Sequence, residues 1–464
     1  MNAGEAATAA GNRTPVPDEF AGWWAGRQAA HGFEVTGIPF EELDGWRFEP
    51  GGNLVHESGR FFTVEGLRVR SDDGSGWDQP ILHQPEIGIL GILVKDVGGV
   101  PHCLMQAKME PGNVNGLQLS PTVQATRSNY TRVHGGGRTR YLEHFWGPRR
   151  GRVLVDVLQS EQGAWFWQKH NRNMIVQVDG DVPEHPDFHW LPLPDVLRLL
   201  RVEDLVNMDS RTVLGCMPRT LLAGSSDAPG SSGVPGSVDA FGAALRRSYG
   251  ADGRPPSALT SQRDLETWLL DVKSRGRWET RLIPLSEAHG WDRDRDAIAS
   301  GDGPFRIMAV RVRAGSREVT RWSQPMLEPS ARRRAAFLAR SVGGVLHLLV
   351  QARFEPGLMA KVELAPTVLL PPPDAASGPV PFLDQVLAAD PARVRFDANL
   401  SEEGGRFYHA RTRYQVIDVA DDFPREIPGS HAWMTVHQLM ELVRHGQYLN
   451  VEARSLLACL HGLA

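Results

Sequence analysis

The stretch Gln106-Ala-Lys-Met-Glu-Pro-Gly112 recurs about 245 residues later as Gln351-Ala-Arg-Phe-Glu-Pro-Gly357. Val97-Gly-Gly-Val-Pro-His102 returns at the same offset as Val342-Gly-Gly-Val-Leu-His347. Three tryptophans recur in register, Trp23 with Trp268, Trp46 with Trp291 and Trp77 with Trp322. A period of this length is too long for a solenoid and indicates duplication of a whole domain.

The repeat also sets the domain organisation. Past the first hundred residues the offset slips slightly, and Ser160-Glu-Gln-Gly163 pairs with Ser401-Glu-Glu-Gly404. We predict an N-terminal module over residues 18–222 and a duplicated C-terminal module over residues 259–464. A Ser-, Gly- and Pro-rich linker over residues 223–258 is expected between them, and a disordered tail over residues 1–17 before them.

Both modules show the same order of expected elements, which predicts an α+β fold. Each opens with an amphipathic helix, for which Ser261 is a plausible N-terminal cap. Residues 62–69 and 305–312 alternate apolar and polar side chains, as strands do. Gly98-Gly99 stands where a hairpin turn is needed, and helices are expected at residues 194–201 and 210–217. Each module is therefore predicted to be a mixed β-sheet flanked by helices.

Composition narrows the class of protein. The chain has 464 residues and a formal net charge of -5, which gives no electrostatic reason to expect nucleic acid as a partner. No apolar run is long enough for a transmembrane helix, so no membrane partner is expected. The three cysteines are far apart and form no Cys-x-x-Cys pair, which favours a reducing, cytoplasmic compartment.

The two copies differ in their polar side chains after the shared stretch. Asn113 of the first copy becomes Leu358 in the second, and Gln124 becomes Leu369. The loop that follows becomes the Pro-rich segment at 371–379 in the second copy, which carries almost no catalytic functionality. We therefore expect the working site in the first copy and a degenerate site in the second.

The loop after Gln124 in the first copy combines arginine, glycine and acid–base residues. Arg127, Arg132, Arg138 and Arg140 are suited to pairing a diphosphate, and the glycines at 135–137 let backbone amides approach phosphate. The acid–base candidates are Lys108, Tyr130, His134, Tyr141 and Glu143. A solvated basic loop is the alternative interpretation, and the contrast with the second copy favours function.

The run at 106–113, followed by 118–130 and Tyr141-Leu-Glu143, resembles the sugar-nucleotide 2,3-dehydratases of antibiotic deoxysugar pathways. The resemblance covers nearly the whole chain, including the duplication. It implies Nudix-like modules, a cytoplasmic homodimer, one true active site and one vestigial pocket per subunit, and a dTDP-4-keto-6-deoxyglucose-type substrate. The Nudix signature itself is absent, so metal-dependent pyrophosphate cleavage is not expected.

The implied reaction is an elimination, which makes the expected enzyme a hydro-lyase. The ketone at carbon 4 acidifies the proton on carbon 3, the hydroxyl on carbon 2 leaves, and the enol becomes a 3,4-diketo-2,6-dideoxy sugar. No cofactor or metal is expected, because the ketone supplies the electron sink. We assign the acid–base candidates collectively, and prefer Tyr or Lys at the oxyanion and His or Glu as the base. The expected substrate contacts are Asn113, Gln118, Thr122, Gln124, Arg127, Ser128, Asn129, Arg138, Arg140 and Trp165.

Other interpretations of these residues were weighed. Glu110 is expected to be structural because its partner Glu355 survives in the degenerate copy, and sheet packing is favoured over thymine stacking for Trp165. His185 and His189 have ligand spacing, but nearby prolines and the lack of a carboxylate pattern argue against zinc. The alternative functions are a nucleotide-sugar pyrophosphohydrolase, which needs a metal-binding carboxylate cluster that the sequence does not display, and a non-catalytic sugar-nucleotide binding protein.

Overall fold

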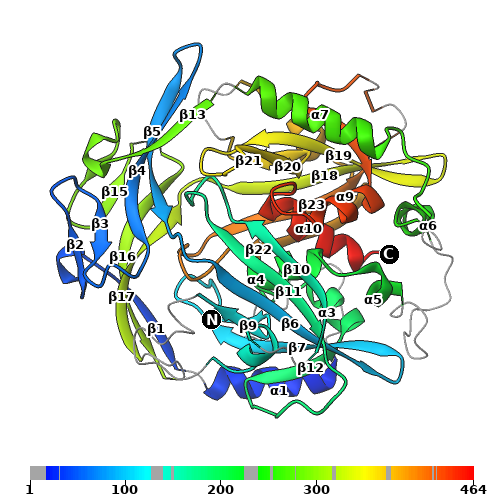
Figure 1. Cartoon of the computed structure of the whole chain (residues 1–464), viewed down its shortest axis with the longest axis horizontal. Helices are drawn as coiled ribbons and strands as arrows, with labels where there is room; N and C mark the ends of the chain where they lie inside the picture. The colour runs from blue at the N-terminus through cyan, green and yellow to red at the C-terminus, as the bar shows by residue number, and fades with distance from the viewer. Residues whose placement is uncertain are drawn as a thin grey trace.

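The two halves of the chain repeat the same order of strands and helices. The protein is described by a computed structural model over residues 17–30, 32–126, 139–147, 151–223, 239–250, 254–276, 278–301, 303–315, 320–372, 378–420, 423–424 and 426–464. Two larger sheets lie on one side of the molecule and two smaller sheets on the other (Figure 1). The α+β class and the duplication predicted from the sequence are confirmed. No helix in the described ranges is long and apolar enough to span a membrane.

One large sheet belongs to each half. The first has the order β10-β11-β6-β7-β12, with β9 added to β6 and β8 to β7. Its strands are β6 (Gly88–Val97), β7 (Val100–Met109), β8 (Leu117–Ser120), β9 (Val123–Ala125), β10 (Arg152–Ser160), β11 (His170–Gln177) and β12 (Phe188–Pro192). The pair β6–β11 is parallel and its neighbours are antiparallel, so the sheet is mixed as predicted.

The second large sheet repeats this pattern in the order β20-β19-β18-β23-β22, with β21 added to β18 and β24 to β19. Its strands are β18 (Arg333–Val342), β19 (Val345–Phe354), β20 (Val362–Pro366), β21 (Val368–Leu370), β22 (Val394–Ser401), β23 (Arg411–Asp418) and β24 (His431–Thr435).

Gly98 and Gly99 have φ of +63° and +85° in the turn between β6 and β7, which confirms the predicted hairpin.

The two small sheets each contain a strand from the opposite module. β1 (Phe33–Ile38) pairs with β16, and β13 (Trp278–Ile283) pairs with β4. The remaining strands are β2 (Trp46–Phe48), β3 (Leu54–His56), β4 (Thr63–Ser71), β5 (Gly76–His83), β14 (Asp292–Arg293), β15 (Ala297–Ala299), β16 (Phe305–Ala314) and β17 (Arg321–Pro329). Because the first strand of each module completes the other module's small sheet, the two modules are interlocked.

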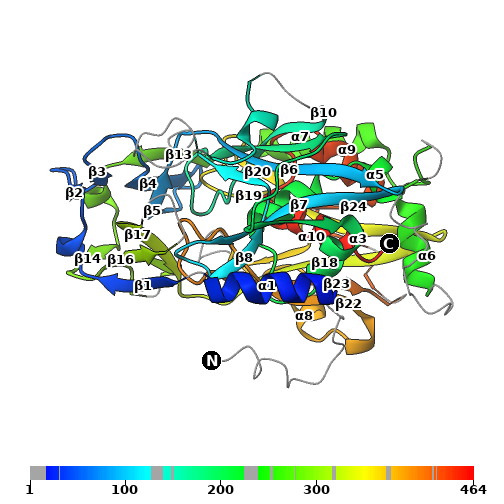
Figure 2. The same ribbon diagram turned by 90° about the horizontal axis from the view of Figure 1, so that it is seen from below.

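The helices pack mainly against the large sheets. They are α1 (Asp18–Ala30), α3 (Leu193–Leu199), α4 (Met208–Gly215), α5 (Arg219–Ala223), α6 (Ala240–Ser248), α7 (Gln262–Arg275), α8 (Leu383–Leu387), α9 (Val436–Val443) and α10 (Val451–His461). The predicted cap of α7 is confirmed, because the Ser261 side chain accepts a hydrogen bond from the Asp264 amide. α1 lies beside β12 of the first large sheet (Figure 1), where Trp23 stacks on His189 at a ring-centroid distance of 5.1 Å. Seen from below, α1 runs along the edge of the molecule near β8 (Figure 2).

Two buried arginines connect the modules at the centre of the molecule. Arg211 of α4 donates from Nη2 to the Ser401 carbonyl at 2.6 Å. The equivalent Arg454 of α10 donates from Nη2 to the Ser160 carbonyl. Both guanidinium groups are fully buried, and each also donates to a carbonyl just before its own helix. Each helix thereby fixes the loop that follows β10 or β22 in the opposite module, and those loops carry Glu161 and Glu403.

Candidate active site

A cavity of about 870 Å³ opens between the two modules. Its floor is formed by the end of β7, the start of α4 and the loop after β10 from the first module, together with the loop after β22 from the second. Three of the acids on this floor, Glu110, Asp209 and Glu403, lie close together, and Glu161 is the fourth. The working site is therefore shared between the modules, although the first module contributes most of its wall.

A close contact between two turns places Glu110 beside Glu403. The Gly112 amide donates to the Gly404 carbonyl at 2.7 Å, and the Gly112 carbonyl accepts from the His409 amide at 2.9 Å. A Cβ atom on Gly112 would lie 1.7 Å from the Phe407 carbonyl oxygen, so a side chain there is excluded. This requirement explains why Gly112 belongs to the motif shared by both copies, since Gly357 makes the equivalent approach to Phe166.

The three carboxylates are close enough to influence one another. One oxygen of each of Glu110, Asp209 and Glu403 lies within 4.8 Å of the other two. Asp209 Oδ1 and Glu403 Oε2 accept no hydrogen bond from the described residues. Oxygen atoms at this spacing suit a hard divalent cation, and they equally suit acids that share protons. The structure thus contains the carboxylate cluster that the sequence did not display, and that part of the sequence argument was wrong.

Burial and repulsion between neighbouring carboxylates raise the pKa of two acids on the floor of the cavity. Burial, reinforced by the nearby Glu110 carboxylate, raises the pKa of Glu403 to about 7. Burial, together with the charges of Glu161 and Glu110, raises the pKa of Asp209 well above its usual range. The floor therefore contains acids able to donate a proton beside a carboxylate able to accept one.

Glu161 and Lys169 are two further ionisable residues at the floor of the cavity. The Glu161 carboxylate accepts from Asn171 Nδ2 at 2.7 Å, and burial raises its pKa. Lys169 donates from Nζ to the Glu86 carbonyl. Burial lowers the pKa of Lys169 to about 8, against the pull of Glu161. The sequence analysis missed Lys169; its one signal was that the second copy has Ala410 at the equivalent position.

Lys108 and Gln124 line the wall next to Glu110, as predicted from the sequence. Lys108 Nζ donates to the Gln124 carbonyl at 3.0 Å and lies 3.9 Å from Glu110 Oε1. Gln124 Nε2 donates to Glu110 Oε1 at 2.9 Å, while its Oε1 accepts from Ser120 and Asn207. Both side chains are held rigidly by the strands that carry them, β7 and β9.

The remaining predicted residues fall into three groups. Thr122 and Arg140 also line the cavity, although the Thr122 hydroxyl is bonded to the Leu104 carbonyl and the Leu93 amide. Arg127, Ser128, Asn129, Tyr130, Arg132, His134 and Arg138, with the glycines at 135–137, lie outside the described residues. Asn113, Gln118, Tyr141, Glu143 and Trp165 are described but are not among the residues that line the cavity.

Most of this last group have partners within the protein. Tyr141 donates its hydroxyl to the Pro183 carbonyl at 2.5 Å. Gln118 is fully buried and accepts from Ser401 Oγ at 2.9 Å, and Asn113 Nδ2 donates to the Gly116 carbonyl. Trp165 packs edge-on against Phe407 with ring centroids 4.4 Å apart. Gln118 and Trp165 thus contact the second module, whereas the hydrogen bonds just given for Tyr141 and Asn113 stay within the first module.

A second, much smaller cavity of about 40 Å³ occupies the equivalent place in the second module. Arg333, Arg353 and Trp165 line it, where the first cavity has Gly88, Lys108 and Arg406. The space is thus filled by larger side chains at matching positions. A working site in the first copy and a degenerate site in the second were expected; the second module also supplies Glu403 and Arg406 to the lining of the first cavity.

Comparison with known proteins agrees with this arrangement. Residues 17–217 and 262–460 match the family described as NDP-hexose 2,3-dehydratase. The chain belongs to this family. The two matched ranges correspond to the two modules, so the dehydratase family is itself built on the duplication.

Curated members of the dehydratase family are similar over almost the whole chain. The dTDP-4-dehydro-6-deoxy-alpha-D-glucopyranose 2,3-dehydratase of Saccharopolyspora spinosa is 50% identical over 455 residues, 96% of this chain and 91% of that protein. The protein of the same name from Streptomyces violaceoruber is 50% identical over 96% of this chain and 97% of its own. That from Amycolatopsis orientalis is 46% identical over 95% of this chain and 89% of its own.

Proposed function

We propose that the protein dehydrates dTDP-4-dehydro-6-deoxy-glucopyranose across carbons 2 and 3. The observation that supports this most directly is the shared floor of Glu110, Asp209 and Glu403, in a chain half identical to dehydratases of that name. An elimination next to a ketone needs a base, an acid and a donor to the developing oxyanion. The cavity offers all three within one small region.

The reaction is balanced without an external oxidant or reductant. The base takes the proton from carbon 3, and the electron pair is delocalised onto the oxygen at carbon 4. When the enolate collapses, the bond between carbon 2 and its hydroxyl breaks, and the leaving oxygen takes a proton as water. The resulting enol, with its hydroxyl on carbon 3, tautomerises to the 3,4-diketo-2,6-dideoxy sugar nucleotide.

We assign these steps to residues on the floor of the cavity. Glu110 acts as the base, held by Gln124 on one carboxylate oxygen. Glu403 acts as the acid, since its raised pKa of about 7 leaves about half of it protonated at neutral pH and most of it protonated below neutral pH. Lys108, 3.9 Å from Glu110, stabilises the oxyanion. Tyr130 and His134 stay candidates for the same roles from the sequence.

The substrate contacts are proposed from the residues that reach the cavity or adjoin it in sequence. Gln124 and Arg140 line it. Arg127, Ser128 and Asn129 follow directly after Thr126, and Arg138 directly precedes Thr139. Thr126 and Thr139 both line the cavity, and the four neighbouring residues keep the roles expected of them. Guanidinium groups in this segment would pair the diphosphate in a bidentate manner.

A metal-dependent pyrophosphohydrolase is the second candidate function, and the carboxylate cluster is the specific observation in its favour. The cluster has the oxygen donors and the spacing that a divalent cation requires, so Glu110, Asp209 and Glu403 would be the residues to hold one. When bound, such an ion would supply Lewis-acid stabilisation of a developing oxyanion. Family membership favours the dehydratase.

Several finer expectations from the sequence remain proposals. They are the Nudix-like fold of each module, the module boundaries 18–222 and 259–464, the homodimer and the cytoplasmic location. The reducing compartment is supported by Cys103, Cys216 and Cys459, which are buried and unpaired.

The test is to incubate the purified protein with dTDP-4-dehydro-6-deoxyglucose carrying deuterium at carbon 3, and to follow the products by mass spectrometry. Loss of one water together with the deuterium is expected. The experiment is repeated after chelation and after restoring divalent cations, which measures any metal requirement directly. Release of dTMP would establish the hydrolase instead, and an unchanged but bound substrate would contradict both activities.

A further inference from the structure

The last step of the proposed reaction needs a proton donor of its own. Once water has left, the sugar is an enol, and it becomes a ketone only when carbon 2 gains a proton and the carbon-3 hydroxyl loses one. Glu403 has by then given its proton to the leaving oxygen, and Glu110 holds the proton from carbon 3. Two ionisable residues on the floor, Glu161 and Lys169, take no part in the elimination.

Lys169 lies in the loop between β10 and β11, and the second module repeats the backbone contacts of this loop. The Lys169 carbonyl accepts from the Glu161 amide at 2.9 Å. In the second module the Ala410 carbonyl accepts from the Glu402 amide at 2.8 Å. The backbone therefore brings the same two positions together in both modules, and only the first module places an amine beside the acid.

The residue before Lys169 shows the same likeness between the modules. Gln168 has a φ of +47° and its equivalent His409 has a φ of +50°, both in the left-handed region. The Gln168 amide donates to the Gly357 carbonyl at 2.7 Å, and the His409 amide donates to the Gly112 carbonyl at 2.9 Å. Because both loops are fixed in this way by the opposite module, the position of the Lys169 backbone is set by the fold and not by its amine.

The Lys169 amine is buried at the floor without a carboxylate bonded to it. The residue is 5% exposed, and its Nζ donates to the Glu86 carbonyl. Within the described ranges no ion pair neutralises the Lys169 ammonium, whereas Lys108 lies 3.9 Å from Glu110 Oε1. Burial lowers the pKa of Lys169 to about 8, so the ammonium form prevails at neutral pH and can still give up its proton.

The Glu161 carboxylate keeps one oxygen open. Its Oε1 accepts from Asn171 at 2.7 Å, while its buried Oε2 accepts no hydrogen bond from the described residues. In the second module both oxygens of Glu402 are occupied, one by the Tyr414 hydroxyl at 3.0 Å and the other by Gln162 Nε2 at 3.2 Å. The first module therefore has both an amine and an open acceptor where the second has neither.

We infer that Lys169 and Glu161 form a second acid–base pair, which converts the enol to the ketone before the product leaves. The Lys169 ammonium gives a proton to carbon 2, where the electron pair of the carbon–carbon double bond forms the new bond to hydrogen. Glu161 takes the proton of the carbon-3 hydroxyl, and the electron pair of that O–H bond completes the carbonyl. Exchange with solvent restores both groups. The inference rests on the proposed function, because the enol arises only from the dehydration.

The test follows carbon 2 during turnover in D₂O. The wild type is given dTDP-4-dehydro-6-deoxyglucose, the product is reduced with borohydride as it forms, and NMR gives the configuration at carbon 2. A single configuration of deuterium is expected, because an enzyme group delivers it to one face. Lys169→Met and Lys169→Arg are expected to slow this step about 100-fold or more, since neither side chain donates a proton near neutral pH. Deuterium should then occupy both configurations, and the enol should appear as a transient ultraviolet absorbance.

A second buried lysine supplies the matched control. Lys361 also donates from Nζ to a backbone carbonyl, that of Trp278, and it is not among the residues that line the cavity. Lys361→Met is expected to leave both the rate and the single configuration unchanged. Thermal unfolding of each variant shows whether it is folded.

Several results would overturn the inference. One is a single configuration in both folded Lys169 variants, and another is a random configuration in the wild type. A third needs no variant: with substrate deuterated at carbon 3 in ordinary water, deuterium found at carbon 2 would show that Glu110 returns the proton. Loss of the elimination itself in both variants, read as retention of the carbon-3 deuterium, would place Lys169 in the first step instead.

Failure of the inference and failure of the proposed function give different results. If the wild type removed water but protonated carbon 2 at random, the dehydration would stand and only the second acid–base pair would be lost. If the wild type removed no water, the proposed function would fail, and the inference with it.

Discussion

The cavity between the modules and its equivalent in the second copy are lined by matching elements of the duplicated fold. Their volumes are nevertheless about 870 and about 40 Å³. The second cavity is filled at matching positions. Arg333 replaces Gly88, Arg353 replaces Lys108, Leu369 replaces Gln124 and Trp165 replaces Arg406. Most of the acids were retained, since Glu355, Glu402 and Glu452 stand where the first cavity has Glu110, Glu161 and Asp209.

The difference teaches what decides the role of a buried acid. In the second module Glu452 is bonded to Arg333 at 3.0 Å, Glu355 accepts from Asn450 at 3.1 Å, and Glu402 accepts from Tyr414 at 3.0 Å. On the first floor two of the three clustered acids keep an oxygen without a partner. Glu110 was expected to be structural because Glu355 survives in the degenerate copy, and its place in the carboxylate cluster of the first cavity is what supports the catalytic role proposed for it. Of the retained acids, Glu452 is paired with the Arg333 guanidinium, whereas Glu355 and Glu402 accept hydrogen bonds from the neutral side chains of Asn450 and Tyr414.

The largest expected effect comes from removing the proposed acid and base. Glu403→Gln and Glu110→Gln should each lower kcat by about 10²- to 10⁴-fold, because the amide neither accepts nor donates the transferred proton. Glu355→Gln, the equivalent of Glu110→Gln, is expected to leave kcat unchanged. A full rate in Glu403→Gln would show that the second module only frames the cavity.

The comparison predicts that one substitution closes the working cavity. Gly88→Arg places in β6 the side chain that fills the second cavity from β18, and Asn171→Thr, which matches Thr412, removes the Oδ1 atom that would lie 2.7 Å from a Cβ on residue 88. The double variant should fold and lose about 100-fold or more in kcat/KM, as loss of substrate positioning does. Asn171→Thr alone is the control, and retained activity in the folded double variant would contradict the comparison.

The converse change tests stability and not catalysis. At a pH above about 8, Arg333→Ala should lower the free energy of unfolding by about 3 kcal/mol, because it leaves the buried, ionised Glu452 carboxylate without its cation. Burial and the nearby Glu355 charge raise the pKa of Glu452 to about 8 even in the wild type, above its unfolded value. Its folded state therefore binds the extra proton, and stability contributed by that proton is present at low pH and lost as pH rises towards 8. Chemical denaturation at two pH values measures both effects, and unchanged activity is expected.

The pH profile separates the acids of the first cavity. Glu403 donates only when protonated, and its pKa is about 7. The wild-type kcat should therefore fall about tenfold per pH unit above that value. The residual rate of Glu403→Gln should lack this fall, since no titrating donor remains at that position. A flat wild-type profile between about pH 6 and about pH 9 would assign the proton donor elsewhere.

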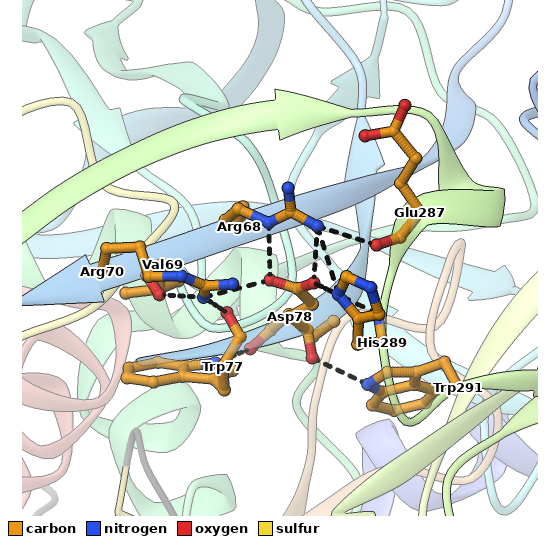
Figure 3. Close-up of polar contacts among 9 residues, drawn as sticks. Arg68, Val69, Arg70, Trp77, Asp78, Glu287, His289 and Trp291 are labelled. Atoms are coloured by element: carbon orange, nitrogen blue, oxygen red, sulfur yellow. Dashed lines mark hydrogen bonds and ion pairs between the residues drawn. The ribbon is translucent and has the colours of Figure 1, made fainter. Parts of the chain in front are cut away.

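The smallest effect is expected at the ion cluster that Asp78 forms with Arg68 and His289 (Figure 3). Burial opposes ionisation of Asp78, but its hydrogen bonds from Arg68 and His289 lower its pKa to about 2. The His289 side chain is 83% exposed, so His289→Ala should cost less than about 1 kcal/mol in the free energy of unfolding. A loss as large as that of Arg333→Ala would show that the cluster holds the module together.

The sequence by itself determined the duplication, the mixed α+β modules and the hairpin at Gly98-Gly99, and it singled out Lys108 and Gln124, which line the first cavity. These follow from repeated motifs, from strand periodicity and from a contrast between copies, all of which can be read along a chain. The difference between the two cavities could be expected in the same way, because aligning the two copies shows where polar residues of the first are replaced by apolar residues in the second.

Only the tertiary structure decided which groups meet. Glu110, Asp209 and Glu403 are far apart in sequence and come together because Gly112 docks against the turn at 404–407 and because Arg211 holds the loop after β22. The exchange of β1 and β13 between small sheets likewise brings β17 beside the first module. A contact between modules has no periodicity within either one, so no pattern along the chain predicts it; it follows from close packing of two complementary surfaces.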